Sequence, residues 1–340
     1  MKTLRRVFVA QALLASLAVP LVSWAAGAMP DYKIAGPIKS HNLEVFIIHG
    51  SDTAKSQNIQ TMAEAMKANS FKVFETGNVN ELACQNLSSL PVFIQSGDIV
   101  KGGRQDRTMQ YDLLVPPHSK KMPLSSFCVE SGRWQKRGSE SDSLFSSSMK
   151  SLPGRELKLA AKYSADQGAV WASVSKSQGQ LRKASMRVTE NASPTSLQMT
   201  MENGDIEKTA ATYTNDLKTL ASKDKDAIGY AFSIDGKLNS ADVYASHDLF
   251  VKLWPKLLEA TAVEAVSAGP TAAAAPNSPK PKPVGVDDVK GFLSASEGAK
   301  PALKRISAET SQETRDSAKA VYFETKTNDN NWLHKNYIMK

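Results

Sequence analysis

The sequence predicts an α+β fold, in which an antiparallel β-rich core forms a sandwich or partial barrel and helices from the second half pack on it. Short strand-like runs separated by turn residues dominate residues 43–130. Apolar residues recur at helical spacing after residue 155, and a hairpin pattern interrupts these helices. Strands and helices that are segregated along the chain in this way are typical of the α+β class.

The first half is predicted to be mainly strands. Strands are expected at residues 43–48, 71–74, 92–95, 109–115 and 124–130, with one helix at residues 53–68. The clearest alternation runs from Met109 to Val115, where apolar residues face one way and polar residues such as Asp112 the other. Pro116 ends this strand because proline cannot donate a ladder hydrogen bond.

The second half is predicted to carry most of the helices. They are expected at residues 155–163, 168–178, 205–220 and from Ser246 onward. Ser246 is a favourable N-cap, and Pro255 predicts a kink in the last of these helices. Before that helix, residues 228–234 and 241–244 are expected to be strands joined at Asp235-Gly236, a dipeptide typical of tight hairpins.

Composition divides the chain into four parts. Residues 1–25 combine a basic start, an apolar stretch and small residues, which is typical of a signal peptide cleaved after Ala25 or Ala28. The main domain is expected at residues 29–266, an Ala/Pro-rich linker at 267–283, and at 284–340 a helix plus β-hairpin that docks on the main domain. The mature protein is therefore expected to be exported, periplasmic or secreted, with no membrane anchor after cleavage.

The net charge bears on the kind of binding partner, and the two cysteines raise the question of a disulfide. The formal charge falls from +8 to +5 when Lys2, Arg5 and Arg6 are removed with the signal peptide. A mildly basic export product gives no reason to expect a nucleic acid polymer as partner. Cys84 and Cys128 could form a disulfide in an oxidising compartment, or Cys128 could remain a buried thiol within its apolar strand.

The segment from residue 92 to 134 carries the candidate ligand site. Its glycine pair allows backbone amides to approach a ligand or to form an anion-binding concavity. Its arginines could grip phosphate or carboxylate, its tryptophan could stack on a base or sugar face, and its glutamine could fix a polar edge. The predicted ligand-binding residues are Gly102, Gly103, Gln105, Arg107, Glu130, Arg133 and Trp134.

A purely structural alternative exists for the same residues. In it, the segment is a bulged hairpin whose arginines pair with Glu130 and Asp106, and Trp134 only covers the core. If the residues instead bind a ligand, Arg107→Ala should abolish binding with little loss of stability.

The same segment contains candidate catalytic groups. Glu130 could form the carboxylate pair of a hydrolase with Asp106, or with Asp98 or Glu75. Cys128 with His118 could form a nucleophile pair, although His118 follows two prolines beside lysines and is expected in an exposed turn.

The sequence shows no pattern typical of a metal or cofactor site. The five histidines are scattered, and no pair has the spacing of metal ligands, so no metal site is predicted. The sequence contains no P-loop, G-x-S-x-G or G-x-G-x-x-G motif, so no cofactor is expected.

Four segments together carry a family resemblance: residues 75–86, 96–107, 125–134 and 229–265, with WLHKNY at residues 332–337 as a further similarity. In order and spacing they resemble the ARG and Rhodanese-Phosphatase-superfamily-associated Protein domain, a bacterial domain of unknown function. The family name implies association with ADP-ribosylglycohydrolases, and hence a ligand derived from ADP-ribose or a nucleotide. This implication rests on association and not on the residues.

Three functions are consistent with the sequence. The first is a non-catalytic module that binds an anionic or sugar-containing ligand through the Gly/Arg/Trp segment, and this is the function we favour. The second is a hydrolase of a glycosidic or phosphate-linked substrate with Glu130 as acid or base, which would require Glu130 to be open to solvent. The third is an exported scaffold or interaction domain.

Overall fold

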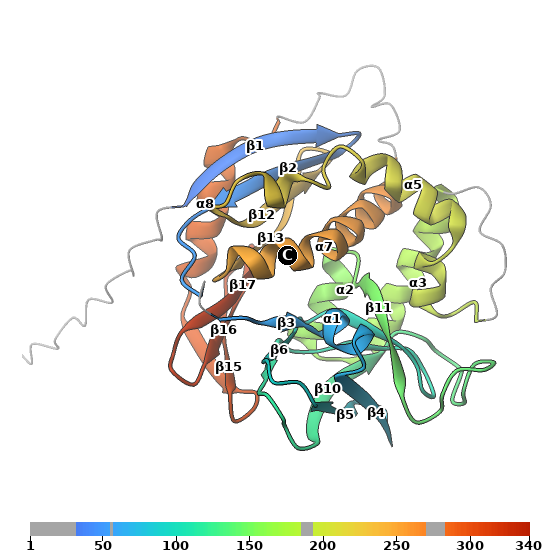
Figure 1. Ribbon diagram of the computed structural model, residues 1–340. Helices are drawn as coiled ribbons and strands as arrows, with labels where there is room; N and C mark the ends of the chain where they lie inside the picture. Colours follow the sequence, from blue (N-terminus) through green and yellow to red (C-terminus); the bar gives the residue numbers. More distant parts are fainter. Residues whose placement is uncertain (1–31, 55–56, 185–192, 270–282) are drawn as a thin grey trace, which may run out of the picture.

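The computed structural model of the chain describes residues 32–54, 57–184, 193–269 and 283–340. The expected signal peptide at residues 1–25 and residues 270–282 of the expected linker lie outside the described residues. The described chain folds into antiparallel sheets with helices packed on them (Figure 1), so the predicted α+β class is confirmed.

An eight-stranded antiparallel sheet forms one side of the molecule (Figure 1). Its strands, in order across the sheet, are β1 (Lys33–Ser40), β2 (Leu43–His49), β12 (Ala227–Ile234), β13 (Lys237–Tyr244), β17 (Trp332–Met339), β16 (Ala320–Thr327), β15 (Thr310–Asp316) and β14 (Pro301–Arg305). Strand β17 pairs with β13 over residues 240–244 of the latter. The last four strands of the chain therefore continue the sheet that earlier segments begin.

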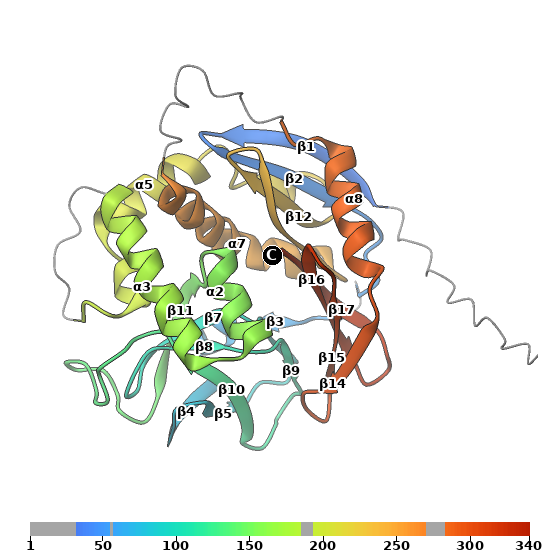
Figure 2. The ribbon, with the colours of Figure 1, turned by 180° about the vertical axis from the view of Figure 1, so that it is seen from behind.

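A smaller, curled sheet forms the opposite side of the molecule (Figure 2). Its strands in order are β11 (Phe145–Ser151), β7 (Asp98–Gly102), β8 (Arg107–Met109), β10 (Met122–Cys128), β5 (Glu81–Asn86) and β4 (Phe71–Asn78). The edge strands β4 and β11 approach each other at a bridge between Phe74 and Leu144, so the sheet curls into a half-barrel. A third sheet joins β3 (Gln60–Thr61), β6 (Val92–Ile94) and β9 (Leu113–Val115).

Helices fill the space between the two large sheets and cover the outer face of the larger one. Helix α7 (His247–Ala268) lies between the sheets, while α8 (Val286–Glu297) covers the other face of the eight-stranded sheet (Figures 1 and 2). The others are α1 (Met62–Lys67), α2 (Arg155–Leu159) with a π-helical turn η1 (Ala160–Ser164), α3 (Gln167–Ala184), α4 (Leu197–Met201), α5 (Gly204–Thr214) and α6 (Leu220–Lys223). None of the helices in the described residues is long and apolar enough to cross a membrane.

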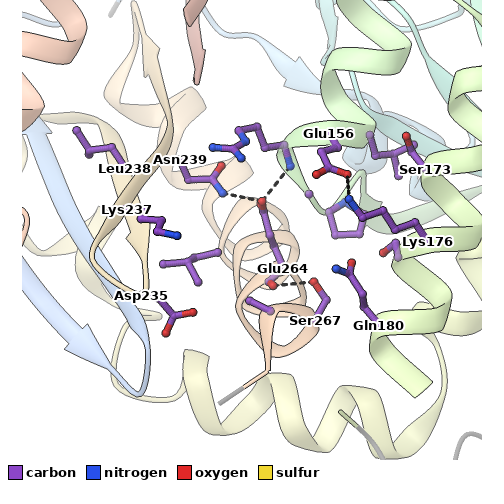
Figure 3. Close-up of a pocket in the computed structure, with 17 residues that line it drawn as sticks. Glu156, Ser173, Lys176, Gln180, Asp235, Lys237, Leu238, Asn239, Glu264 and Ser267 are labelled. Atoms are coloured by element: carbon purple, nitrogen blue, oxygen red, sulfur yellow. Dashed lines mark hydrogen bonds and ion pairs between the residues drawn. The ribbon is translucent and has the colours of Figure 1, made fainter. Parts of the chain in front are cut away.

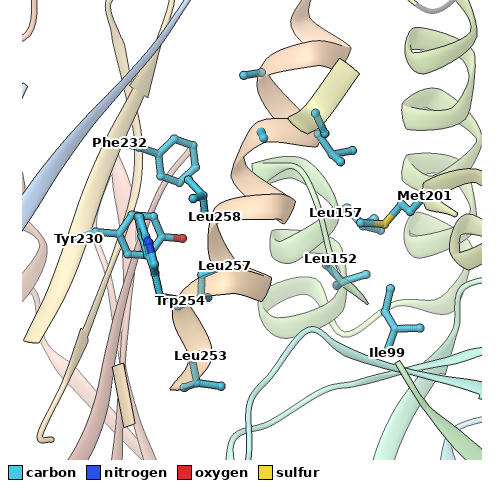
Figure 4. Packing of buried hydrophobic residues seen from close by; sticks show 14 of the residues in the cluster. Ile99, Leu152, Leu157, Met201, Tyr230, Phe232, Leu253, Trp254, Leu257 and Leu258 are labelled. Carbon is cyan, nitrogen blue, oxygen red and sulfur yellow. The ribbon is translucent and has the colours of Figure 1, made fainter. Parts of the chain in front are cut away.

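The core on both sides of α7 explains why this helix holds the fold together. Figure 4 shows Tyr230 and Phe232 of β12 on one side of α7, and Ile99 of the half-barrel on the other. Trp254 of α7 is 2% exposed and packs edge-on against Tyr230, with ring centroids 5.1 Å apart. Its indole N–H donates to the carbonyl of Leu217 at 3.2 Å, so this buried polar group is paired.

Local turn and cap signals were predicted correctly. Asp235 and Gly236 both have positive φ, as a tight hairpin turn between β12 and β13 requires. The Ser246 side chain accepts a hydrogen bond from the backbone N–H of Leu249 and caps α7.

Two strand predictions were incomplete. The predicted strand at residues 109–115 is divided between β8 and β9, which belong to different sheets. Between them the chain bends just before Asp112, whose carboxylate accepts a hydrogen bond from the Ser96 backbone N–H at 2.7 Å. Residues 284–340 contain four strands where one hairpin was expected. The strand β14 is exposed along its whole length, so it shows no alternation of apolar residues from which it could be predicted.

The central helix gives a first prediction. Trp254→Ala should lower the free energy of unfolding by about 3–5 kcal/mol, because it removes a buried indole between the sheets and leaves a cavity. Chemical denaturation followed by circular dichroism measures this change. Leu303→Ala is the control, since Leu303 is 72% exposed and its truncation should cost little. Equal losses in the two variants would contradict the central role of α7.

Candidate functional site

The predicted ligand-binding residues meet at one end of the half-barrel, in the loop between β7 and β8 and in the segment after β10. Glu130 is 0% exposed and receives a two-pronged ion pair from Arg133, with Nε–Oε1 at 2.7 Å and Nη2–Oε2 at 2.6 Å. The Ser193 hydroxyl and the backbone N–H of Asp106 also donate to this carboxylate. Both Glu130 oxygens are therefore already used within the protein.

Asp106 is neutralised in the same way. Its carboxylate is 0% exposed and accepts hydrogen bonds from both Nη atoms of Arg137 at 3.0 Å. It also accepts from the Ser196 hydroxyl at 2.6 Å and from the Gly102 backbone N–H at 3.0 Å. Arg137 was not among the predicted site residues. This is the internal pairing that the sequence left open as an alternative, and it assigns Asp106, Glu130 and Arg133 to holding the two loops together.

The geometry gives no support to Glu130 as an acid or base. A catalytic carboxyl must reach a substrate proton, whereas Glu130 is closed from solvent by its ion pair with Arg133. Of its other suggested partners, Asp98 pairs with the buried Lys256 of α7, and Glu75 lies beside Arg107. These carboxylates are parts of separate ion pairs.

Arg107 differs from the other arginines of the segment. Its side chain is 0% exposed, and only Nη1 is hydrogen-bonded, to the Cys128 sulfur at 2.8 Å and to the Gln105 carbonyl at 3.4 Å. Nε and Nη2 have no hydrogen-bond partner, and the nearest carboxylate oxygen, Oε2 of Glu75, is 3.6 Å from Nη2. Because the side chain is buried and faces Glu75, replacing it by alanine should cost stability, contrary to the expectation from sequence.

Trp134 covers Arg107. The indole is 42% exposed, and the guanidinium carbons of Arg104 and Arg107 both lie 5.5 Å from its ring centroid. Gly103 turns the loop beneath it with φ of +55°, and a Cβ at this position would lie 2.9 Å from Oε2 of Glu75. Gln105 is 4% exposed. Gly103, Gln105, Arg107 and Trp134 thus form one cluster. Glu130 and Arg133 form an ion pair behind it, and Gly102 donates its backbone N–H to Asp106 there.

The two cysteines are free thiols, so the disulfide left open by the sequence is not formed. Strand register explains this, because Cys84 on β5 pairs with Met122, six residues before Cys128 on the same strand β10. That separation is roughly 20 Å along an extended strand, far beyond disulfide reach. Burial raises the pKa of the Cys128 thiol to about 11, although the charge of Arg107 opposes this shift. His118 is exposed in the turn after Pro117, with φ of +48°, whereas Cys128 is buried.

Sequence reasoning missed a buried charge cluster around His334 of β17. The imidazole Nδ1 is 2.8 Å from Asp112 Oδ2, and Nε2 is 3.0 Å from Asp242 Oδ1. Lys162 of the π-helical turn lies 3.8 Å from Asp112, and Thr325 donates to the same carboxylate at 2.6 Å. All five side chains are at most 6% exposed. The cluster therefore ties β17, β16 and β13 to the half-barrel side of the molecule.

The charges of this cluster follow from its geometry. Burial alone would lower the pKa of His334, but the charge of Asp112 and hydrogen bonds to Asp112 and Asp242 outweigh it, so the pKa is raised. Burial opposes ionisation of Asp112 and Asp242 as well, yet the nearby cations and the bond to His334 hold both pKa values below the usual range. Burial lowers the pKa of Lys162, partly offset by Asp112.

A sequence signal for the cluster existed. Asp242 stands between Ala241 and Val243, and Lys162 follows Leu159, Ala160 and Ala161. The signal is weaker at His334, because Lys335 and Asn336 follow it on the same strand. A charged side chain at a core position requires a partner of opposite charge. No group of three His, Cys, Asp or Glu side chains within the described residues could hold a metal ion.

Comparison with known protein families gave one match. The family described as ARG and Rhodanese-Phosphatase-superfamily-associated Protein domain matches residues 31–338. The match spans nearly the whole chain, so the chain belongs to this family, a domain of unknown function. Comparison with curated proteins and with solved structures gave no match.

The His334 cluster predicts a pH dependence of stability. The pKa of His334 is higher in the folded protein than its value of 6.5 in the unfolded chain. Its contribution to stability is therefore complete below pH 6.5 and is lost as the pH rises through the pKa of the folded protein. The pKa values of Asp112 and Asp242 are lower in the folded protein than the 3.8 of the unfolded chain, so their contribution to stability is lost as the pH falls below 3.8. The cluster should therefore contribute most between these two values.

Urea unfolding at several pH values tests this. The variant His334→Asn should lose about 3–5 kcal/mol at pH 6, because two buried carboxylates lose their partner, and its alkaline decline in stability should be shallower than that of the unmodified protein. His118→Asn, at an exposed histidine, is the matched control and should keep the original profile. An unchanged alkaline slope in His334→Asn would show that His334 is not the titrating group.

Proposed function

We propose that this member of the ARG and Rhodanese-Phosphatase-superfamily-associated Protein domain family is an exported, non-catalytic protein that binds an anionic, sugar-containing ligand of the nucleotide or ADP-ribose class. The ligand lies against Arg107 and Trp134. The observation that supports this most is the Arg107 guanidinium, which is fully buried while two of its three nitrogens, Nε and Nη2, have no hydrogen-bond partner.

An unpartnered buried donor is costly. A guanidinium has five N–H groups, and leaving a buried one without an acceptor costs about 1–3 kcal/mol. Arg133 and Arg137, in the segment after β10, each lie within ion-pair distance of both Asp106 and Glu130. Because the neighbouring arginines are paired and two nitrogens of Arg107 have no hydrogen-bond partner, we infer that a ligand supplies the acceptor for Arg107. The two oxygens of a phosphate or carboxylate group can accept from Nε and Nη2 together.

Trp134 supports the sugar or base part of the ligand. A half-exposed indole beside two guanidinium groups offers an aromatic face at the surface. Stacking of a base or sugar ring on such a face contributes about 1–3 kcal/mol. The indole now covers Arg107, so it must shift when an anion reaches Nε and Nη2. Gly103 and Gln105 border the same position, whereas Glu130, Arg133 and Gly102 support the loops and do not contact the ligand.

Export is part of the proposal. The support is the pattern of residues 1–25, with a basic start, an apolar stretch and small residues before the expected cleavage point. The hydrolase alternative has no comparable support, since Glu130 and Asp106 are both held in internal ion pairs.

Tryptophan fluorescence tests the proposal. The unmodified protein and Trp134→Phe are each titrated with ADP-ribose, ADP and inorganic phosphate, and the difference between their emissions is the signal of Trp134. We expect a saturable change with ADP-ribose and ADP, and a weaker affinity for phosphate because phosphate cannot stack. Arg107→Lys should weaken ADP-ribose binding at least tenfold, because lysine keeps the charge but loses the bidentate fork.

Arg133→Lys is the matched control. Since Arg133 is committed to Glu130, this variant should lose stability and keep its affinity. Unchanged affinity in Arg107→Lys, or no response of Trp134 to any of the three ligands at millimolar concentration, would contradict the proposal and favour a scaffold.

A further inference from the structure

A crevice lies at the C-terminal end of α7, and none of Gly103, Gln105, Arg107 and Trp134 lines it. Four elements form its walls: the start of α2, one face of α3, the β12–β13 hairpin and the last turns of α7. Figure 3 shows the side chains of Glu156, Lys176, Asn239 and Glu264 gathered around this space. The cavity has a volume of about 250 Å³ and opens to solvent.

A β-bulge directs one side chain into the crevice. In the pairing of β12 with β13, Phe232 lies opposite Ser240 and Ser233 opposite Leu238, so Asn239 is the extra residue. A bulge re-aims the side chain that it carries, and bulges are common beside binding sites. Here the Asn239 amide donates to Glu264 Oε1 at 2.6 Å.

Glu264 is the anchor of the crevice. Its Oε1 accepts hydrogen bonds from Asn239 and from the backbone N–H of Arg155 at 2.9 Å, which fixes the carboxylate. Its Oε2 is buried and has no hydrogen-bond partner. Sugar hydroxyl groups donate hydrogen bonds and satisfy this oxygen once the carboxylate turns it toward the crevice.

Two cations at the crevice are free to hold an anion. Arg155 and Lys237 both line the cavity, and no acidic side chain among the described residues pairs with either. Lys176, in contrast, is paired with Glu156 at 2.5 Å on the exposed rim. The apolar side chains of Leu157, Ile234 and Leu238 also line the cavity and suit the C–H face of a sugar ring.

Volume limits the ligand. Drug-sized molecules occupy pockets of about 300–1,000 Å³, so 250 Å³ fits a ligand of roughly one sugar ring with one substituent. A separate cavity lined by Lys158, Asp242 and Ala260 has a volume of about 20 Å³, which holds about one water molecule and no sugar. The ligand is therefore confined to the crevice.

We propose that this crevice is a second ligand site, which takes a monosaccharide bearing one phosphate or carboxylate. The anionic group lies between Arg155 and Lys237, and the ring hydroxyls donate to Glu264. The site shares no residue with the Arg107 cluster, so it stands or falls independently of the function proposed there.

Isothermal titration calorimetry of the full mature chain tests the site. The probes are glucose 6-phosphate, glucuronate and, as the neutral member, glucose. We expect measurable binding of at least one charged sugar and at least tenfold weaker binding of glucose; comparing the two charged probes identifies the anionic group. The titrations are made in an Arg107→Lys background, so that the first site does not contribute, and adding Arg155→Gln to this background should weaken binding of the charged probe about tenfold or more.

Lys208→Gln is the matched control, because Lys208 is an exposed cation on α5 that does not line the crevice. It removes one charge and should not alter binding, whereas Lys237→Gln should weaken it. Circular dichroism confirms that each variant is folded. Binding that is equal in Arg155→Gln, Lys237→Gln and Lys208→Gln, or absent for all three sugars, would overturn the proposal.

Discussion

The position of His334 between Asp112 and Asp242 is the interaction on which the rest of the structure depends. Asp112 belongs to the half-barrel side, Asp242 to the centre of the large sheet and His334 to the last strand of the chain. Two carboxylates in a dry core are tolerated only when cations and hydrogen bonds neutralise them. The residues after 284 therefore supply both a strand for the sheet and a charge that the core requires, so the fold needs them in place.

The same rule separates the residues of the candidate site into two roles. Asp106, Glu130, Arg133 and Arg137 neutralise one another and hold the loops that follow β7 and β10. Among the described residues, Arg107 has one carboxylate within ion-pair distance, at 3.6 Å, and two of its nitrogens have no hydrogen-bond partner. The loops are held by ion pairs that are complete, and they surround one cation that is not fully paired. Such an arrangement is expected of an anion site, because rigid loops fix the free donors in position.

The sequence allowed prediction of features that depend on near neighbours. The Asp235-Gly236 turn and the Ser246 cap depend on a few consecutive residues, and both are present. The segment around Gly103 and Arg107 was also recognised as a cluster of polar residues among glycines. Which of its charges would be satisfied could not be predicted, because Ser193 and Ser196 reach Glu130 and Asp106 from 63 and 90 residues away.

The His334 cluster was missed for the same reason. Its two hydrogen bonds join residues 222 and 92 positions apart, and no local pattern brings these segments together. The crevice at α7 also depends on distant partners, since Asn239 and Glu264 come from a hairpin and a helix. The sequence could have shown only that Asp242 and Lys162 follow apolar residues, and that a charge buried at such a position needs a partner.

The most direct test of the account is nitrogen-15 NMR of the arginine side chains, with the Arg107 resonance assigned by its disappearance in Arg107→Lys. Addition of ADP-ribose should shift the Arg107 Nε signal and slow exchange of its proton with water, because a new acceptor protects it. The Arg133 and Arg137 signals should stay in place, since their partners do not change. A ligand that leaves Arg107 Nε unaltered at saturation, or that moves Arg133 in its place, would contradict the assignment of Arg107 as the ligand-binding cation.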